Sequence, residues 1–139
     1  TLTAYLFSGL MTQIMKRVFF NEIARPSRFF ELNDIGYELH LVPGVDLHSW
    51  NSFPSGHTTA AFAVFFGLSL FLPSASARFL SFLLAAGVAW SRIHLSQHFL
   101  MDVSAGAVVG MAGAGVAYWW IARYDRSWLD QPVTHWRKR

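Results

Sequence analysis

Apolar residues gather in four long stretches of the chain, and most of the connections between them are short. The stretches cover residues 2–20, 58–72, 77–93 and about 98–122. Each is roughly 16–25 residues long, and about 20 apolar residues are needed to cross 30 Å of hydrocarbon. The pattern therefore predicts four helices long enough, or nearly long enough, to span a membrane.

The distribution of charge favours the same interpretation. Hydrophobic residues make up 53% of the chain and charged residues only 14%, against about 25% charged residues in soluble domains. Between Asp46 and Arg123 the only charged residues are Arg78, Arg92 and Asp102. Core helices of a soluble protein would explain one such stretch, but not four in series. We expect an all-α protein, a polytopic transmembrane helix bundle with about four spans.

We expect residues 1–139 to form a single membrane-embedded domain, with an extramembrane loop at 26–53 and a cytoplasmic tail at 123–139. Loop 26–53 is the only long polar segment. Its length suits a lid or a substrate-entry loop as well as a solvated connection, and a piece around Phe29 and Phe30 could lie on the lipid surface. The chain begins at Thr1 inside an apolar run. We therefore expect it to be N-terminally truncated, with about six spans in the full protein.

The last apolar stretch is rich in small residues. Gly106 and Gly110 form a small-xxx-small pair, which allows two helix backbones to approach closely. The aromatic residues 118–120 near its end are typical of a membrane interface. This stretch is predicted to pack tightly against a neighbouring helix.

Three polar clusters fall at the same end of the predicted bundle: Lys16 with Arg25, residues 52–57, and residues 91–102. In the third cluster, His98 and Asp102 are four residues apart and share a helical face. A carboxylate there can accept the proton on one imidazole nitrogen, which leaves the other nitrogen free as a nucleophile. An unpaired carboxylate in an apolar span costs at least about 2.5 kcal/mol, so Asp102 needs such a partner.

The other two clusters suit an anion. Backbone N–H groups at Ser55 and Gly56, where a helix begins, form a cradle together with the Ser55 hydroxyl. His57 follows in the first turn and could protonate a leaving oxygen. Lys16, Arg25 and Arg92 supply positive charge, and the planar fork of Arg92 matches phosphate oxygens. The set predicts chemistry on a phosphoryl group.

These clusters resemble the signature of the type 2 phosphatidic acid phosphatase superfamily, written K-x6-R-P, P-S-G-H and S-R-x5-H-x3-D. Residues 54–57 match the second motif, and residues 91–102 match the third without a spacing error. The first motif differs from the K-x6-R-P pattern, because eight residues rather than six separate Lys16 from Arg25. We expect Lys16 still to reach the phosphate from the last turn of its helix.

The resemblance implies a metal-independent phosphatase that needs no cofactor. His98 would attack phosphorus and form a phosphohistidine, Asp102 would orient it, and His57 would protonate the leaving group. The implied phosphate ligands are Lys16, Arg25, Ser55, Gly56 and Arg92. The implied substrate is a phosphomonoester or diphosphate of a phospholipid, an isoprenoid or lipid A.

Several alternatives remain at this stage. They are a lipid phosphotransferase, a transporter or structural membrane protein with a vestigial site, and a vanadium haloperoxidase, which the apolar spans disfavour. His94, His98 and Asp102 follow one another at four-residue steps, as metal ligands can, but three nearby cations oppose a metal. We expect His94 to line the mouth of the pocket, and His40, His48 and His135 to be loop residues without a chemical role.

Basic residues give an orientation. Six basic residues lie at the end away from the histidines and five at the histidine end, so the raw count of basic residues does not indicate an orientation. Lys16, Arg25 and Arg92 are assigned to the chemistry. When these three are left out, six basic residues lie at one end and two at the histidine end, so the active site is predicted to face away from the cytoplasm. We expect a bacterial inner-membrane protein. Scattered basic residues do not suggest nucleic acid binding, and the oligomeric state is open.

Overall fold

The structure, a computed structural model, describes residues 2–34, 36 and 39–124, and within them every regular element is a helix. The elements are α1 (Leu2–Ile14), the π-helical segment η1 (Met15–Phe19), α2 (Pro26–Asn33), α3 (Gly56–Ser69), α4 (Ala75–His94) and α5 (Leu100–Tyr124). The all-α prediction is confirmed, and a helix occupies each of the four apolar stretches. The predicted tail lies outside the described residues from residue 125 onward.

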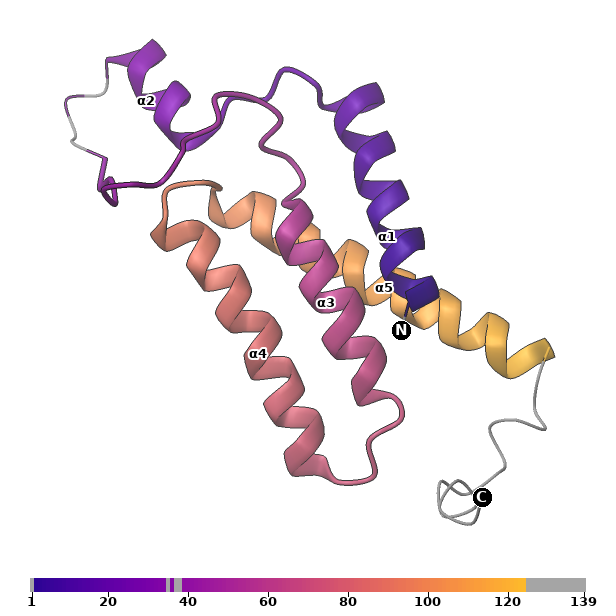
Figure 1. Ribbon diagram of the computed structural model, residues 1–139. Helices are drawn as coiled ribbons and strands as arrows, with labels where there is room; N and C mark the ends of the chain where they lie inside the picture. Colours follow the sequence, from indigo (N-terminus) through magenta and orange to yellow (C-terminus); the bar gives the residue numbers. More distant parts are fainter. Residues whose placement is uncertain (1, 35, 37–38, 125–139) are drawn as a thin grey trace.

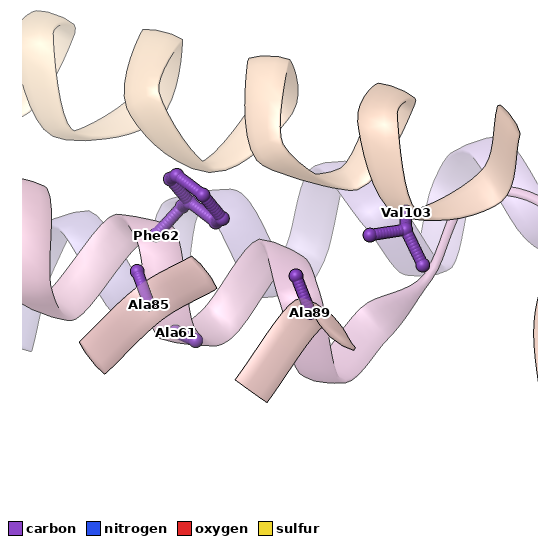
Figure 2. Close-up of a cluster of buried hydrophobic side chains, with 5 residues drawn as sticks. All are labelled: Ala61, Phe62, Ala85, Ala89 and Val103. Atoms are coloured by element: carbon purple, nitrogen blue, oxygen red, sulfur yellow. The ribbon is translucent and has the colours of Figure 1, made fainter. Parts of the chain in front are cut away.

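Helix α3 is the central element. It packs against α5, α4 and α1, and α1 also packs against α5 (Figure 1). A small apolar cluster lies where three of these helices meet, as Figure 2 shows. Its members are Ala61 and Phe62 from α3, Ala85 and Ala89 from α4, and Val103 from α5. Contacts of α3 with three helices therefore fix the relative positions of the elements that carry the polar clusters.

The predicted close packing of the last helix is present at α3. A Cβ atom on Gly106 would lie 2.6 Å from the carbonyl oxygen of Ser55, and one on Gly110 would lie 2.5 Å from that of Thr59. Such distances are too short for any side chain, so only glycine allows α5 to approach α3 this closely. The contact brings the beginning of α3 next to the beginning of α5.

Four helix ends meet at one end of the bundle. They are the end of α1 with η1, the beginning of α3, the end of α4 and the beginning of α5, and α2 with the adjoining loop lies over them (Figure 1). Helix α2 occupies the position of the amphipathic piece considered around Phe29 and Phe30. All three predicted polar clusters therefore lie at one end of the molecule.

The outer surface of the bundle is strongly apolar. Exposed side chains include Leu6 and Leu10 on α1, Phe79 and Leu83 on α4, and Trp119 on α5. Among the described residues, one helix is long and apolar enough by length and composition to cross a membrane, over Leu100–Arg123. Helices α1 and α3 have 13 and 14 residues, or about 20 Å at 1.5 Å per residue.

Candidate active site

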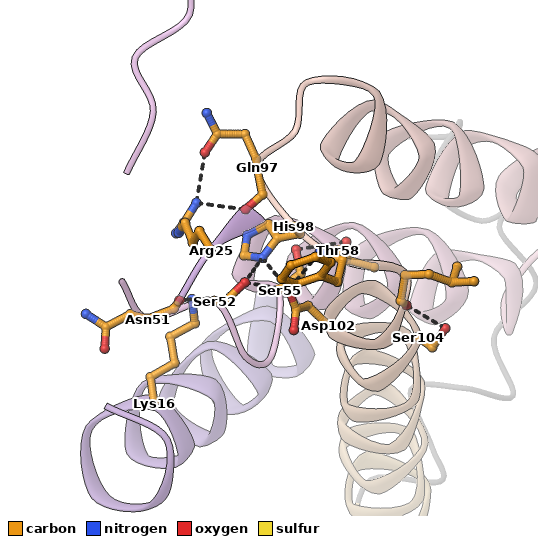
Figure 3. Close-up of polar contacts among 12 residues, drawn as sticks. Lys16, Arg25, Asn51, Ser52, Ser55, Thr58, Gln97, His98, Asp102 and Ser104 are labelled. Atoms are coloured by element: carbon orange, nitrogen blue, oxygen red, sulfur yellow. Dashed lines mark hydrogen bonds and ion pairs between the residues drawn. The ribbon is translucent and has the colours of Figure 1, made fainter. Parts of the chain in front are cut away.

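A buried histidine–aspartate pair lies at the beginning of α5. Asp102 is fully buried in the first turn of that helix. Its Oδ2 accepts hydrogen bonds from the Ser52 hydroxyl at 2.5 Å and from the Phe99 backbone N–H at 2.9 Å. His98 Nδ1 lies 3.4 Å from the same oxygen (Figure 3). The carboxylate is thus held from three sides, and the imidazole is oriented by it.

The environment of His98 favours a neutral ring. His98 lies between α4 and α5 and is only 3% exposed. Burial lowers the pKa of His98 below its ordinary value of 6.5, and the positive charges of Arg25 and Lys16 add to this, while the hydrogen bond to Asp102 opposes it. With Nδ1–H donated to Asp102, the lone pair of Nε2 is available for nucleophilic attack.

Ser52 is the first residue of the predicted cluster 52–57, but the sequence interpretation gave it no role in the site. Its hydroxyl bonds Asp102 and lies 3.5 Å from His98 Nδ1. The residue stands next to the 54–57 motif, but 50 positions separate it from Asp102. No local spacing could have indicated the contact.

The beginning of α3 is joined to the beginning of α5. The Ser55 backbone N–H donates to the Asp102 carbonyl oxygen at 2.9 Å, and the Ser55 hydroxyl accepts from Thr58 Oγ1 at 3.0 Å. Ser55 is fully buried, whereas Gly56 and His57 line an open cleft. Gly56 of the predicted cradle and the adjacent His57 therefore face the cleft. Ser55 lies beneath the cleft, and its backbone N–H is already bonded to Asp102.

The cleft has a volume of about 820 Å³ and a strongly cationic end. Lys16, Arg25 and Arg92 all line it together with His57 and His98. The described residues place no carboxylate within ion-pair distance of these three cations. Asp46 also lines the cleft, but the three cations outnumber it, and the resulting net positive charge favours an anionic ligand.

Lys16 reaches this end of the cleft despite the longer spacing of the first motif. It lies in η1, beyond the end of α1, and its Nζ donates to the Asn51 carbonyl oxygen at 2.8 Å. Burial, with the nearby charge of Arg25, lowers the pKa of Lys16 to about 8. The neighbouring Arg17 is exposed and does not line the cleft. A π-helical turn is wider than an α-turn, and such turns are frequent at functional sites.

One wall of the cleft is largely apolar. It is formed by Tyr5, Leu6, Gly9 and Leu10 of α1, opposite Ala60 of α3. Gly9 has no atom within 4 Å of the position where a Cβ would stand, so the wall is open at this point. The cleft therefore joins a cationic end to an apolar side.

The remaining histidines differ in part from expectation. His94 is exposed and its ring lies 5.5 Å from that of His40, because α4 ends there and the chain turns away. His94 is not among the residues that line the cleft, whereas His48 is. Within the described residues, no group of three His, Cys, Asp or Glu side chains is placed to hold a metal ion. His135 lies outside the described residues.

Fold and site together define a class: helical bundles in which a buried histidine–aspartate pair lies at a cleft lined by cationic side chains. The chain belongs to the PAP2 superfamily, whose profile it matches over residues 1–126. The family expected from the sequence motifs is thus confirmed.

The relatives include enzymes that act on lipid A. The chain is 30% identical over 108 residues to a lipid A 1-phosphatase of Rhizobium etli, covering 78% of this chain and 43% of that protein. It is 39% identical over 69 residues to the bacitracin transport permease protein BcrC of Bacillus licheniformis, covering 50% of this chain and 33% of the relative. The chain spans less than half the length of these curated relatives.

A solved structure shares the fold. It is the crystal structure of LpxE from Aquifex aeolicus, with a TM-score of 0.65 and 26% sequence identity. The match covers 84% of this chain and 64% of the LpxE chain. The helical arrangement is therefore similar over most of this chain to that of a solved structure.

Proposed function

We propose that this chain carries the catalytic site of a membrane lipid phosphatase that works through a phosphohistidine. The observation that supports this most is the convergence of three unpaired cations on the oriented, buried His98. A neutral imidazole aimed into a cationic cleft suits attack on phosphorus, because the transition state carries negative charge on the phosphoryl oxygens.

In the first step, His98 Nε2 attacks phosphorus while the bond from phosphorus to the leaving oxygen breaks. The imidazolium that forms keeps its proton on Nδ1, hydrogen-bonded to Asp102, and the Asp102 carboxylate stabilises the new positive charge. His57, on the cleft wall in the first turn of α3, donates a proton to the leaving oxygen. Lys16, Arg25, Arg92 and the Gly56 backbone hold the phosphoryl oxygens, with Ser55 supporting the turn from below.

In the second step, water attacks the phosphohistidine. His57, now neutral, accepts a proton from this water, and the bond from phosphorus to Nε2 breaks. Inorganic phosphate leaves and His98 returns to its neutral form, so both histidines end in their starting state. The chain's own residues supply every proton transfer in this scheme, and it requires no metal or other cofactor.

The apolar side of the cleft supports a lipid as the substrate. Tyr5, Leu6 and Leu10 would lie beside the hydrocarbon part of a lipid whose phosphate sits among the cations. Two relatives bear the name lipid A 1-phosphatase. Lipid A phosphates are therefore the first substrates to test, followed by undecaprenyl diphosphate, phosphatidate and phosphatidylglycerol phosphate.

We further propose that α1, α3, α4 and α5 all lie within a bacterial inner membrane, with the cleft on the extracytoplasmic side and loop 26–53 outside the bilayer. The exposed apolar side chains on α1 and α4 favour this, since large apolar surfaces are costly in water. Helices shorter than the hydrocarbon thickness are tolerated where the bilayer thins or one end is buried in protein.

One relative is named a transport permease, so a protein that binds lipid phosphate without hydrolysing it is the competing function. The full-length protein in detergent should release inorganic phosphate from at least one lipid of the panel in the presence of EDTA. His98→Ala should abolish that release. Binding of lipid phosphate without any release by the wild-type protein would favour the permease-like function instead.

A further inference from the structure

Arg25 is held by a neutral side chain, Gln97, which occupies an unspecified position of the third motif. Arg25 Nη1 donates to the side-chain oxygen of Gln97 at 2.8 Å and approaches the Gln97 backbone oxygen at 3.4 Å (Figure 3). Gln97 itself is 7% exposed and lies one position before His98. The contact joins a residue of the first motif to the turn that carries the nucleophile.

Gln97 is itself fixed in orientation by a second hydrogen bond. Its Nε2 donates to the backbone oxygen of Asp46 at 2.8 Å. With the amide nitrogen so occupied, the amide oxygen must point to Arg25, because the two groups of a side-chain amide lie on opposite sides. Gln97 therefore connects the backbone of Asp46, which lines the cleft, to the guanidinium of Arg25.

The remaining contacts of Arg25 leave one part of its guanidinium for a ligand. Arg25 Nε donates to the Trp50 backbone oxygen at 3.0 Å. Within the described residues, its side-chain hydrogen bonds come from Nε and Nη1, so the two N–H groups of Nη2 are available in the cleft. Arginine binds phosphate best when its planar fork is fixed in advance.

The neutrality of the partner matters. An aspartate or glutamate in this place would orient Arg25 equally well, but it would also cancel the positive charge that a phosphate needs. A side-chain amide orients the guanidinium and leaves its charge unpaired. The same unpaired charge lies close enough to His98 to lower the pKa of its imidazole.

We propose that Gln97 is a positioning residue that holds Arg25 in the geometry needed to bind the phosphoryl group. The inference rests on the proposed function, because it assigns Arg25 to the phosphate. Gln97 is not expected to touch the substrate. Its whole effect on anion binding should pass through Arg25.

A double-mutant cycle tests this, with inorganic vanadate as the probe and isothermal titration calorimetry on the detergent-solubilised full-length protein as the measurement. Gln97→Leu and Gln97→Met should each weaken vanadate binding by about tenfold, as expected for directly coupled residues. In an Arg25→Ala background, where Lys16 and Arg92 still bind the anion, the same substitutions should change affinity less than twofold. Equal weakening in both backgrounds, or no weakening in either, overturns the proposal.

Ser96→Gly is the matched control, since Ser96 also ties the neighbouring turn to a loop, through the His40 backbone oxygen, but does not touch Arg25. Glycine suits its positive φ of 51°. Ser96→Gly should bind vanadate as the wild type does, and tenfold weakening there would assign the effect to the loop rather than to Arg25.

Circular dichroism reports whether each variant folds. If neither apolar variant folds, Gln97→Glu serves instead. Its carboxylate still accepts from Arg25 but neutralises it, so vanadate affinity should fall by about tenfold. An unchanged affinity in Gln97→Glu contradicts the proposal.

Phosphate release from the panel of lipid phosphates named above separates this inference from the proposed function. A protein that binds vanadate with the expected coupling but releases no phosphate contradicts the phosphatase function alone. A protein that releases phosphate but shows additive effects contradicts the role of Gln97 alone. A wild-type protein that neither binds vanadate nor releases phosphate contradicts both.

Discussion

At the scale of single residues, the site depends on how three groups share one carboxylate oxygen. Asp102 Oδ2 receives the Ser52 hydroxyl, the Phe99 N–H and the edge of His98. Such a carboxylate cannot rotate, and it therefore fixes the plane of the imidazole as well as its tautomer. The proposed nucleophile, His98, is therefore oriented in the absence of substrate.

The lowered pKa of His98 gives a pH prediction. The neutral ring is the reactive form, and burial lowers its pKa below 6.5. On acidification, the midpoint of the fall in kcat/KM should therefore lie below pH 6.5, because protonation of His98 removes the nucleophile. On the alkaline side, kcat/KM should fall as His57 loses the proton that it donates to the leaving group. Arg25→Gln removes a cation that contributes to this lowering, so its acidic limb should move to higher pH. If kcat/KM of the wild-type protein fell on acidification with a midpoint well above pH 6.5, the assignment of His98 as the nucleophile would be contradicted. The measurement is kcat/KM for phosphate release from about pH 4.5 to about pH 8.5, a range that brackets the titration of histidine.

Lys16 provides a second residue-scale prediction. It lines the cleft, whereas the adjacent Arg17 is exposed outside it. Lys16→Ala should lower kcat/KM by about a hundredfold, as loss of one group that stabilises transition-state charge does, and should weaken vanadate inhibition in parallel. Arg17→Ala is the matched control and should remain near the wild type. The reverse ranking in steady-state kinetics would move the phosphate-binding role to Arg17.

At the scale of elements, helix α1 contributes both ends of the proposed substrate site. Leu6 and Leu10 of α1 belong to the apolar wall, and η1, which follows α1, carries Lys16. Gly9 lies seven residues before Lys16, which is about 10 Å along a helix. A single helix thereby relates the position of the phosphate to that of the hydrocarbon.

This arrangement predicts a selective effect of chain length. Gly9→Trp places a large ring where the cleft is open at α1, with no atom of the protein within 4 Å to resist it. The variant should lower kcat/KM at least about tenfold for long-chain lipid phosphates, because contacts with remote substrate groups contribute to transition-state binding. A short water-soluble phosphate ester should be hydrolysed at nearly the wild-type rate.

Gly115→Trp on α5 is the matched control, since Gly115 also has open space around it but does not line the cleft. Its activity on both substrates should equal that of the wild type. Equal loss on short and long substrates in Gly9→Trp would show that the apolar wall does not bind the hydrocarbon chain.

At the scale of the whole molecule, one end of the bundle is chemically different from the rest. The polar clusters, α2 and loop 26–53 lie there, and the helix surfaces away from it are apolar. In a membrane, this asymmetry would place the reaction at the headgroup level of one leaflet.

The absence of cysteine in the sequence makes the orientation easy to test. Glu22→Cys lies at the site end and Ser76→Cys at the opposite end, and both positions are exposed. In intact bacteria, a membrane-impermeant maleimide should label Glu22→Cys and leave Ser76→Cys unlabelled until the cells are opened. Labelling of Ser76→Cys alone in intact cells would place the active site on the cytoplasmic side.

The sequence by itself determined the long helices and the pairing of His98 with Asp102. Apolar runs of sufficient length predict helices wherever they occur, because the signal lies in neighbouring residues. The contact of His98 with Asp102 follows from a four-residue step on a helical face, and Gly106 and Gly110 indicate a close helix contact in the same local way. Motif spacing was enough to identify the superfamily.

An amphipathic piece around Phe29 and Phe30 was one interpretation of the sequence here, but helix α2 itself was not predicted. It has eight residues, too few to be stable alone in water. Its Phe29 packs edge-on against Phe99, with ring centroids 5.6 Å apart. The helix therefore depends on a tertiary contact, which no pattern within residues 26–33 could reveal.

Only the tertiary structure decided which groups hold the site in place. Asn51 binds Lys16 across 35 positions of sequence, Ser52 binds Asp102 across 50, and Gln97 binds Arg25 across 72. Each contact is a hydrogen bond, which requires its two atoms to lie within about 3 Å. Spacing along one chain cannot specify such a distance between separate segments, because it depends on how α1, α3 and α5 pack together.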